Sequence, residues 1–575
     1  MLRTHTCGEL RKEHLNKEVV LCGWVHRIRS FGKLTFIDLR DRYGITQLVL
    51  DDNFKDIIKK LRRESVIQVK GKVKERVKIN KNLPTGEIEV IVNQITILNL
   101  AEPLPLDLDN KENNTDETRL KYRYLDLRRE EMKENIIFRH RIAQSIREFL
   151  NSQGFIEIET PMLVKSTPEG ARDYIVPSRI HKGRAYALPQ SPQLYKQILM
   201  IAGFDKYYQL ARCLRDEDLR ADRQPEFTQV DIEMSFVEEE DIFNLVENLL
   251  YYVFKKELNI ELKIPFEKIS YEDAIRYYGN DKPDLRFDLK LEELDFLKQS
   301  NYNIFRSGEK IKGIFVQKRL SKSELKELEE TAKVYKAKGI ITIELFDEVK
   351  GTCIKCLDKK HIEKLKERFR GGTLIIISDK AKIVNDALAA IRNKIGKMLS
   401  LYDEKEFKFC WIVDFPLFEW NEEEKRWEPS HHMFTMPKEE YIEILDKDPG
   451  KVKAQCYDLV LNGVELASGS IRVHKPELQE KIMKVIGLSH NEAIKKFGFL
   501  LEAYKYGGPP HGGIAIGFDR LVAMMKFSND IRDFIAFPKN KKAENPMDGS
   551  PSEISERQWL ELGLKVNYRN INNKS

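Results

Sequence analysis

The first 105 residues alternate short runs rich in β-branched residues with turn residues, and this pattern constrains the fold more than any other feature of the chain. Five runs follow one another: EVVLCGWVHRIR, KLTFIDLRD, ITQLVLDD, SVIQVKGKV and GEIEVIVNQITIL. Runs of this kind predict strands. Five strands within one small segment predict a barrel, and the OB-fold is the leading five-stranded candidate.

The predicted barrel carries arginines and aromatic rings close together. Arg27 and Arg29 occupy alternate positions of the first run, and Phe31 and Phe36 follow. Single-stranded nucleic acid binds such surfaces, because bases stack on rings and phosphates meet arginine. The net charge of +6, from 98 basic and 92 acidic residues, suits a polyanion but also an ordinary lysine-rich protein. A nucleic-acid-binding barrel and a plain barrel with solvated arginines both remain open.

Beyond the barrel, the spacing of hydrophobic residues changes first to that of a helix and then to that of strands. A polar, proline-spaced stretch at residues 101–117 predicts a linker. A helical stripe follows, with Ile142, Ile146, Phe149 and Leu150 on one face and Gly154 at the predicted end. The runs FIEIETP, RAYALPQ, KYYQLARCLRD and QPEFTQVDIEMSF then alternate apolar and polar residues next to hairpin-like turns. They predict an antiparallel sheet rather than a doubly wound one.

Residues 280–408 are rich in Lys and Glu and mix helix-like with strand-like runs, which predicts an inserted domain before strands resume at KFCWIVDFPLF. We therefore predict a multidomain α+β protein, with an OB-fold barrel, an antiparallel-sheet catalytic domain with helices, and an inserted α+β domain. The predicted boundaries are 1–105 for the barrel, 106–130 for a linker or hinge, 131–279 and 409–555 for the catalytic domain, 280–408 for the insertion, and 556–575 for a C-terminal extension.

Cysteine usage and hydropathy limit the class of protein. The seven cysteines have no regular spacing, which argues against a disulfide framework and for a reducing compartment. Cys353 and Cys356 form a CxxC without a second ligand pair, so we predict no zinc site there. No signal-peptide pattern and no apolar run of ~20 residues is present. We expect a soluble cytoplasmic protein with no membrane partner.

One segment of the insertion imitates a catalytic motif. KRLSKSE (318–324) looks like the KMSKS loop of class I aminoacyl-tRNA synthetases, but no HIGH-type partner lies upstream. Ser321 and Glu324 have the spacing of a capping box. We predict a helix start at this segment and no catalytic role.

A different segment crowds charges of both signs between two predicted strands. It reads RDEDLRADRQPEF (215–227), and Arg215 and Glu217 project to the same face because they lie two residues apart. Arginine binds phosphate bidentately, and Phe227 could stack on a purine. The Gly-rich run GGIAIGFDR ends at a second arginine, Arg520, and no P-loop motif is present. A solvated loop explains either arginine alone, whereas a phosphate-binding pocket explains all these features together.

These segments resemble a known family. RDEDLRADRQPEF and GIAIGFDR resemble motifs 2 and 3 of class II aminoacyl-tRNA synthetases, and GFIEIETP resembles motif 1. STPEGARDY (166–174) and QSPQLYKQ (190–197) resemble the aspartyl type, whose bacterial members also combine an N-terminal barrel with an insertion. The resemblance covers essentially the full length. It implies aspartate–tRNA ligase activity: L-aspartate attacks ATP to form aspartyl-adenylate, and the aspartyl group is then transferred to the 3′ end of tRNA-Asp.

The resemblance also implies partners and site residues. The partners are ATP with Mg²⁺, L-aspartate, tRNA-Asp and a second copy of the chain, and charging of tRNA-Asn stays open. The implied catalytic residues are Arg215, Glu217 and Arg520. The implied aspartate-binding residues are Glu169, Gln193, Lys196, Arg215, Asp231, His431 and Arg472, with His432 held less firmly. The implied ATP-binding residues are Arg215, Asp216, Glu217, Gln224, Phe227, Glu465, Gly517, Phe518, Asp519 and Arg520.

Three further sets follow from the same resemblance. Asp458 and Glu465, on either side of an Asn-Gly turn, would hold Mg²⁺ on the ATP phosphates. Pro161 would lie at the dimer interface. The residues implied to read a QUC anticodon, with queuosine or guanosine first, are Arg29, Phe36, Gln47 and Glu89.

Two rival interpretations remain. A relative that binds nucleic acid without catalysis would have no need of Arg215, Glu217, Glu465 and Arg520, yet all four are present. A class II synthetase for asparagine or lysine is disfavoured by QSPQLYKQ and by the insertion. Amino-acid-dependent exchange between ATP and pyrophosphate distinguishes these interpretations.

Overall fold

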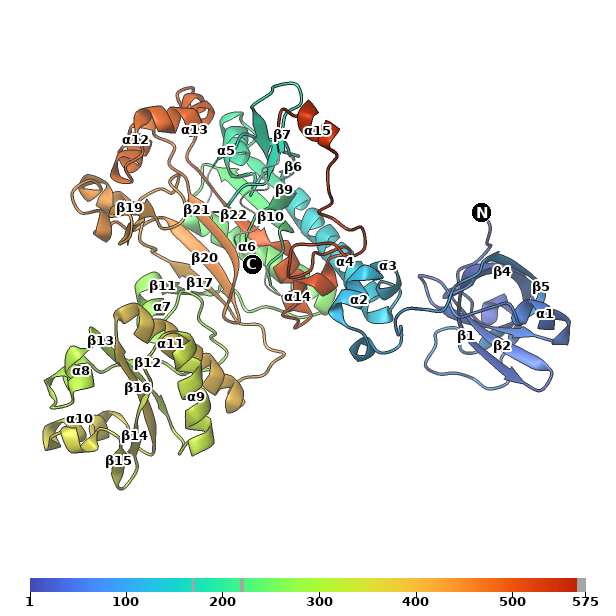
Figure 1. Ribbon diagram of the computed structural model, residues 1–575, viewed down its shortest axis with the longest axis horizontal. Coiled ribbons are helices and arrows are strands. Elements are labelled where there is room, and N and C mark those ends of the chain that lie inside the picture. The colour runs from blue at the N-terminus through green and yellow to red at the C-terminus, as the bar shows by residue number, and fades with distance from the viewer. Residues whose placement is uncertain (168–170, 218–221, 566–575) are drawn as a thin grey trace. The chain divides into compact units, whose positions relative to one another are not determined.

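The computed structural model describes residues 1–167, 171–217 and 222–565. The contacts of the chain divide it into two compact units, Met1–Arg129 and Glu130–Ser575. Figure 1 shows the elements of both units along the chain, from blue at the N-terminus to red at the C-terminus. Each unit is described by itself.

The N-terminal unit contains the predicted barrel. Its strands are β1 (Glu18–Phe31), β2 (Leu34–Arg40), β3 (Ile45–Leu50), β4 (Val66–Glu75) and β5 (Ile88–Asn99), closed in the order β1-β2-β3-β5-β4. A short helix, α1 (Lys55–Ile58), lies between β3 and β4. Along β1, Val19, Leu21 and Val25 alternate into one apolar core with side chains of the other strands. The prediction of a five-stranded OB-fold barrel is confirmed.

The rest of this unit is a small helical segment. Two short helices, α2 (Asp116–Lys121) and α3 (Arg123–Asp126), follow an extended stretch. The buried Asp126 carboxylate accepts from Arg119 Nε at 3.1 Å and from Arg123 Nη1 at 2.7 Å. These ion pairs fix the segment, which the sequence predicts as a linker, in a defined conformation.

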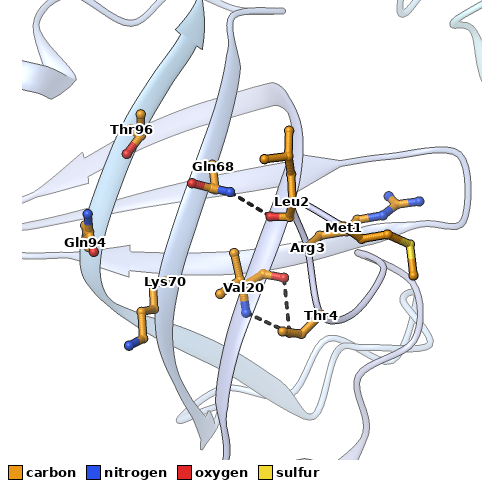
Figure 2. A pocket seen from close by; sticks show the side chains of 9 residues that line it. All are labelled: Met1, Leu2, Arg3, Thr4, Val20, Gln68, Lys70, Gln94 and Thr96. Atoms are coloured by element: carbon orange, nitrogen blue, oxygen red, sulfur yellow. Dashed lines mark hydrogen bonds between the residues drawn. The ribbon is translucent and has the colours of Figure 1, made fainter.

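A hollow of about 280 Å³ lies where the N-terminal residues run along the barrel (Figure 2). Gln68 Nε2 on β4 donates to the Leu2 carbonyl at 2.6 Å, and the Val20 amide donates to Thr4 Oγ1 at 2.9 Å. The other labelled side chains are Met1 and Arg3 of the N-terminal segment, Lys70 of β4, and Gln94 and Thr96 of β5, and none of the implied anticodon residues is among them. The hollow therefore belongs to the packing of the N-terminal segment on the barrel.

The larger unit is built on an eight-stranded sheet in the order β11-β17-β20-β21-β22-β10-β9-β6 (Figure 1). Strands β9, β10, β22, β21, β20 and β17 pair antiparallel in turn, and β6 and β11 join the two edges in parallel. The strand bounds are β6 Ile156–Glu157, β9 Lys206–Leu214, β10 Glu226–Ser235, β11 Glu267–Ser270, β17 Phe409–Val413, β20 Cys456–Leu461, β21 Val464–Ile471 and β22 His511–Gly517. The predicted antiparallel catalytic sheet is confirmed in its central strands.

Three helices cover one face of this sheet. They are α4 (Glu130–Ser152), α6 (Glu239–Leu258) and α14 (Phe518–Met525), and their apolar stripes share one core with the sheet. On α4, Ile142, Ile146 and Leu150 are buried as the spacing predicts, and Gly154 takes a positive φ just past the helix end. Because strand side chains alternate between faces, the opposite face, called the polar face below, carries Asp231 and Glu233 on β10, but a second apolar core that includes Ile269, Ile412 and Val460 covers its part on β11, β17 and β20.

The insertion is a five-stranded antiparallel sheet in the order β12-β13-β16-β14-β15. Successive side chains of its central strand β16 enter two different apolar cores, one beneath α9 and α11 and one beneath α8 and α10. The elements are α7 Tyr271–Tyr278, β12 Leu291–Glu293, α8 Asn303–Ser307, β13 Lys310–Val316, α9 Lys322–Val334, β14 Ile341–Leu345, β15 Val349–Gly351, α10 Lys359–Arg368, β16 Gly372–Asp379 and α11 Ala381–Met398. The KRLSKSE segment starts α9 through the predicted capping box of Ser321 and Glu324.

Smaller elements surround the polar face of the large sheet. Helix α5 packs against α13 and lies beside β10. The bounds of these elements are β7 Ile175–Pro177, β8 Ala185–Ala187, α5 Gln193–Ile201, β18 Phe418–Asn421, β19 Arg426–Pro429, α12 Pro476–Val485, α13 His490–Tyr504 and α15 Glu556–Glu561. Over the described ranges, the structure has no helix that is both long and apolar enough to cross a membrane.

Candidate active site and anticodon-binding surface

A cavity of about 590 Å³ opens on the polar face of the large sheet. The alternation along β10 explains its chemistry: Val230 and Ile232 enter the apolar core, whereas Asp231 and Glu233 point to the other face. The neighbouring strand β22 contributes Gly513, where an added Cβ would lie 2.0 Å from Glu233 Oε2. Glycine at this position therefore lets the Glu233 carboxylate lie across β22.

Two cations meet these carboxylates. Lys196 Nζ on α5 lies 3.1 Å from Asp231 Oδ1 and 3.3 Å from Glu233 Oε2. Arg472, just after β21, donates from Nε to Glu233 Oε1 at 3.0 Å and from Nη2 to Glu233 Oε2 at 3.2 Å. The side chains of Lys196, Asp231 and Glu233 are at most 1% exposed, and that of Arg472 is 2% exposed. Buried charges are stable only when paired, and these four compensate one another.

The two carboxylates are compensated unequally. Burial pushes the pKa of Glu233 up, but Arg472 and Lys196 together outweigh it and hold that pKa below its usual value. For Asp231, burial dominates and raises the pKa despite Lys196. Asp231 Oδ2 is buried without a hydrogen-bond partner. Asp231 thus retains an acceptor for a further cationic group, whereas Glu233 is saturated.

Two adjacent histidines border this charged cluster with different partners. His432 Nε2 lies 2.8 Å from Arg472 Nη1, and burial together with Arg472 lowers the pKa of His432 well below its usual value. His431 packs edge-on against Phe415, with ring centroids 4.7 Å apart. Both histidines line the cavity. Of the two histidines, the less firmly implied His432 is the one that contacts Arg472, which the resemblance implies to bind aspartate.

The motif 2 arginine lies at another part of the cavity. The Arg215 guanidinium is 5.0 Å from the centre of the Phe227 ring, which faces it across the turn between β9 and β10. Its Nε is buried and has no hydrogen-bond partner. Glu217 pairs with Arg223 at 3.1 Å. The structure thus brings a ring, a guanidinium and a carboxylate together, as a nucleotide requires.

The remaining implied ATP residues fall into two groups. Gln224, Glu465, Gly517, Asp519 and Arg520 line the cavity. Phe518 instead enters the apolar core, and Asp216 pairs with Arg172 through the backbone.

Two of the lining residues also connect secondary-structure elements around the cavity. Asp519 accepts from the Thr228 amide at 2.6 Å and from Arg139, and thereby ties α14 to β10 and α4. Gln224 exchanges hydrogen bonds with the backbone of Lys539, at 2.8 and 3.2 Å. Their contribution to the cavity is therefore partly structural.

The two implied metal ligands flank the turn between β20 and β21. Asp458 is buried, its Oδ1 has no partner, and burial and the nearby Glu465 raise its pKa well above the usual value. Glu465 pairs with Lys282 at 2.9 Å, which outweighs burial and lowers the pKa of Glu465. The described residues contain no group of three or more His, Cys, Asp and Glu side chains that could hold a metal. Two carboxylates with a free buried oxygen fit Mg²⁺, which completes its shell with water and phosphate.

On the barrel, the four implied anticodon residues lie on neighbouring strands. Gln47 Nε2 donates to Glu89 Oε2 at 2.7 Å, and Arg29 Nη2 lies 3.4 Å from Gln47 Oε1. Phe36 pairs with Arg29 across β1 and β2. Arg76 Nη2, which the sequence analysis missed, donates to Gln47 Oε1 at 2.7 Å. The four residues therefore form one surface with Arg76 as a fifth member.

Two implied residues lie apart from these sites. Glu169 falls outside the described residues. Pro161 is exposed just after the edge strand β6, next to the exposed apolar side chains of Met162 and Leu163.

Two family models match this chain, one over the part with the large sheet and one over the barrel. The family model described as tRNA synthetases class II (D, K and N) matches residues 115–541, and an OB-fold nucleic acid binding domain matches residues 19–98. The chain is 51% identical to an aspartate–tRNA(Asp/Asn) ligase of Treponema denticola, over 98% of this chain and 99% of the relative. It is 45% identical to an aspartate–tRNA ligase of Macrococcus caseolyticus, over 99% of each.

The chain belongs to the class II tRNA synthetases. Solved structures of similar fold include an asparaginyl-tRNA synthetase from Pyrococcus horikoshii, at a TM-score of 0.60 and 21% identity over 94% of this chain and 98% of that one. An aspartyl tRNA synthetase from Entamoeba histolytica has a TM-score of 0.59 and 20% identity over 95% of this chain and 93% of that one. The predicted family is confirmed.

Within this class II frame, two residues were missed from sequence: Glu233 of the buried charged cluster and Lys282 of the cavity lining. Glu233 was not singled out, although Gln229, Asp231 and Glu233 place polar residues at every second position of an otherwise apolar strand. That alternation was the available signal. Lys282 gave no signal, because it lies at the start of the insertion and meets Glu465 only in the folded chain.

Proposed function

We propose that this class II synthetase is an aspartate–tRNA ligase, which activates L-aspartate with ATP and transfers it to the 3′ end of tRNA-Asp. The observation that carries the proposal is the buried cluster of Lys196 and Arg472 with Asp231 and Glu233. The near-full-length relatives named aspartate–tRNA ligases support the same substrate.

The cluster suits aspartate in particular. The substrate carboxylate binds Lys196 and Arg472, and the α-ammonium binds the free Oδ2 of Asp231. Gln193 lines the same cavity, has a buried Nε2 without a partner and orients the substrate together with Glu169. Asparagine carries no charge to meet the two cations, so a site built around paired groups rejects it strongly.

ATP occupies the rest of the cavity. Its adenine stacks on Phe227 with Glu217 and Gln224 nearby, Arg215 binds the α-phosphate and Arg520 the γ-phosphate. Fixed cations beside the phosphates stabilise the charge that develops during transfer, and this positioning accounts for catalysis without a strong general acid or base. Asp458 and Glu465 would hold Mg²⁺, which would neutralise charge on the phosphates.

The test is amino-acid-dependent exchange of pyrophosphate into ATP, without tRNA and with Mg²⁺ present. We expect exchange with aspartate and none above background with asparagine or lysine. Exchange with asparagine or lysine in place of aspartate would overturn the substrate assignment. A folded protein without any exchange would favour the non-catalytic interpretation.

The barrel reads the anticodon through Arg29, Phe36, Gln47 and Glu89, with a base stacked on Phe36 and base edges bonded to Gln47 and Glu89. We propose that tRNA-Asn is charged as well as tRNA-Asp, because relatives about half identical over nearly the whole chain are named for both. Charging of purified tRNA-Asp and tRNA-Asn with radioactive aspartate tests this. Aspartylation of tRNA-Asp alone would restrict the enzyme to one tRNA.

The functional form is a homodimer that buries Pro161. Support comes from the exposed apolar side chains of Met162 and Leu163 beside it, since apolar surface at a sheet edge favours association. Light scattering of the purified protein should give twice the chain mass. The domain boundaries and the location in the cytoplasm stay predictions.

A further inference from the structure

The first residues of the insertion enter the adenylation cavity. Lys282, four residues after the end of α7, lines the cavity beside Glu465, His431 and Arg520. Its Nζ lies 2.9 Å from Glu465 Oε2, and its side chain is 40% exposed. The ammonium is therefore already inside the site and still open to a ligand.

The segment that carries Lys282 is held rigidly. Arg286 binds the buried Asp284 carboxylate through Nε at 3.0 Å and Nη2 at 2.7 Å. Arg392, on helix α11 of the insertion, donates from Nη2 to the carbonyls of Asp284 and Phe287, both at 2.9 Å. Arg392 is itself only 1% exposed. The backbone two residues after Lys282 is thus fastened to the core of the insertion.

The same segment packs against the hairpin of the proposed metal ligands. Gly463, in the turn between β20 and β21, has a φ of +83°, and an added Cβ would lie 3.2 Å from Asp284 Cβ. Any larger residue in this turn would both strain the backbone and press on the segment. Close packing at Gly463 therefore fixes the distance between Lys282 and the Glu465 hairpin.

Charge explains what Lys282 can do there. Arg520 Nη1 donates to the Glu465 carbonyl, so both cations lie at the same end of the cavity. Without substrate, Lys282 compensates the Glu465 carboxylate. A triphosphate brings several negative charges to this end, and its oxygens are stronger partners for an ammonium than one carboxylate.

We infer that Lys282 is a phosphate-binding residue of the adenylation site, which leaves Glu465 to bind the β- and γ-phosphates of ATP and the pyrophosphate product. The insertion thereby takes part in catalysis, because its helix α11 positions the segment that supplies this lysine. The inference rests on the proposed adenylation of an amino acid by ATP. It does not depend on which amino acid is activated.

The experiment compares binding of ATP and of AMP to the Lys282→Gln variant by titration calorimetry, with and without Mg²⁺. Loss of a charge-assisted hydrogen bond should raise the Kd of ATP about 10- to 100-fold. The Kd of AMP should not change, because AMP lacks both phosphates. In pyrophosphate exchange, the KM for ATP and for pyrophosphate should rise while the KM for the amino acid stays constant. Lys282→Arg should restore most of the ATP affinity.

A control variant from the same segment keeps the result interpretable. Lys290→Gln removes an exposed lysine from the same segment outside the cavity and should leave ATP binding unchanged. An unchanged or tighter Kd of ATP in Lys282→Gln would overturn the inference and leave Lys282 as a counter-ion of Glu465 only. Equal weakening of AMP would also overturn it, since it would indicate general damage to the cavity. If the wild-type protein catalyses pyrophosphate exchange with another amino acid instead of aspartate, the aspartate assignment is wrong. The comparison of ATP and AMP binding between Lys282→Gln and wild type would still hold.

Positioning by the insertion has its own test. Arg392→Lys should weaken ATP binding and spare AMP, because it loosens the segment without removing Lys282. In the double variant with Lys282→Gln, the two effects should not add, because both act through one ammonium. Fully additive effects would show that Arg392 does not act through Lys282.

Discussion

The proposed adenylation cavity and the proposed anticodon surface use charge in different ways. At the cavity, the side chains of Lys196, Asp231 and Glu233 are at most 1% exposed and pair only with groups from distant segments. On the barrel, Arg29 of β1 is 35% exposed and contacts Asp38 of β2 and Gln47 of β3, while Gln47 and Glu89 are themselves buried.

The difference follows from what each surface binds. A buried cluster selects its ligand by charge, because a charged group that loses a partner there cannot be solvated. An exposed arginine such as Arg29 can rearrange around a base, and such a surface depends on stacking for much of its affinity. Loss of one group should therefore be far more damaging in the cavity than on the barrel.

The strongest test of this comparison is Lys196→Gln. The variant leaves the buried carboxylates of Asp231 and Glu233 with one cation fewer, and it removes a partner of the substrate. Truncating one partner of a buried charge pair in a binding site costs about 2–5 kcal/mol of binding, so kcat/KM for aspartate in pyrophosphate exchange should fall between about thirtyfold and several thousandfold.

The matched control is Lys206→Gln, which removes a lysine at the start of the neighbouring strand β9, away from the cavity lining. Circular dichroism should show that both variants are folded. If folded Lys196→Gln loses less than about tenfold in kcat/KM, the buried cluster is not the aspartate site.

On the barrel, Phe36→Ala should have a smaller and selective effect. Loss of one base stack costs about 1–3 kcal/mol, so kcat/KM for charging tRNA-Asp should fall about 5- to 150-fold. Pyrophosphate exchange without tRNA should be unaffected, because the adenylation site lies in the other unit. Val77→Ala, at a fully exposed position of the same unit, is the control. Equal charging by Phe36→Ala and wild type would contradict anticodon reading by this surface.

A half-buried carboxylate whose nearby cations do not outweigh its burial shows what the cluster around Glu233 avoids. Glu239, near the start of α6, has a buried Oε1 without a partner, and burial raises its pKa to about 7 despite Lys438. Lys438 also pairs with Asp414. The negative charges of Asp414 and Glu240 raise the pKa of Glu239 further, and the positive charge of Lys268 lowers it. The folded protein thus holds this proton more tightly than the unfolded chain, and stability is lost as pH rises from about 4.5 to about 7.

Glu239→Gln should therefore raise the thermal midpoint at pH 8 and leave it nearly unchanged at pH 4.5, where the native carboxyl is already neutral. Glu363→Gln, at an exposed position of α10, should show no such pH dependence. Scanning calorimetry at the two pH values measures both. A midpoint for Glu239→Gln that is lower at pH 8 would show that the charged form is stabilised in the fold.

The same contrast explains what could be predicted from sequence. The barrel was predictable because its strands follow one another and their alternation is visible in the sequence, whereas Gln47 and Glu89 were named only through the resemblance. Lys196, Asp231 and Arg472 could be named through the resemblance, since each lies in a recognisable motif. Glu233 could not be assigned a role, because its partner Arg472 lies 239 residues away. The contact of Lys282 with Glu465 depends on how the insertion packs, which no local pattern encodes.

The smallest expected effect concerns a motif-like segment that is only structural. Ser321 Oγ accepts from the Glu324 amide at 3.2 Å, and the Ser321 amide donates to Glu324 Oε2 at 2.6 Å, which holds the pKa of Glu324 at about 2. Ser321→Ala should cost about 1 kcal/mol of stability, measured as a shift in the thermal midpoint of the insertion, with Ser323→Ala in the first turn of the same helix as the control. Pyrophosphate exchange should not change in either variant, because this segment lies outside the cavity lining. A loss of exchange in Ser321→Ala would instead assign the lysine-rich segment a role in ATP binding, and the insertion would then contribute more than Lys282 to the site.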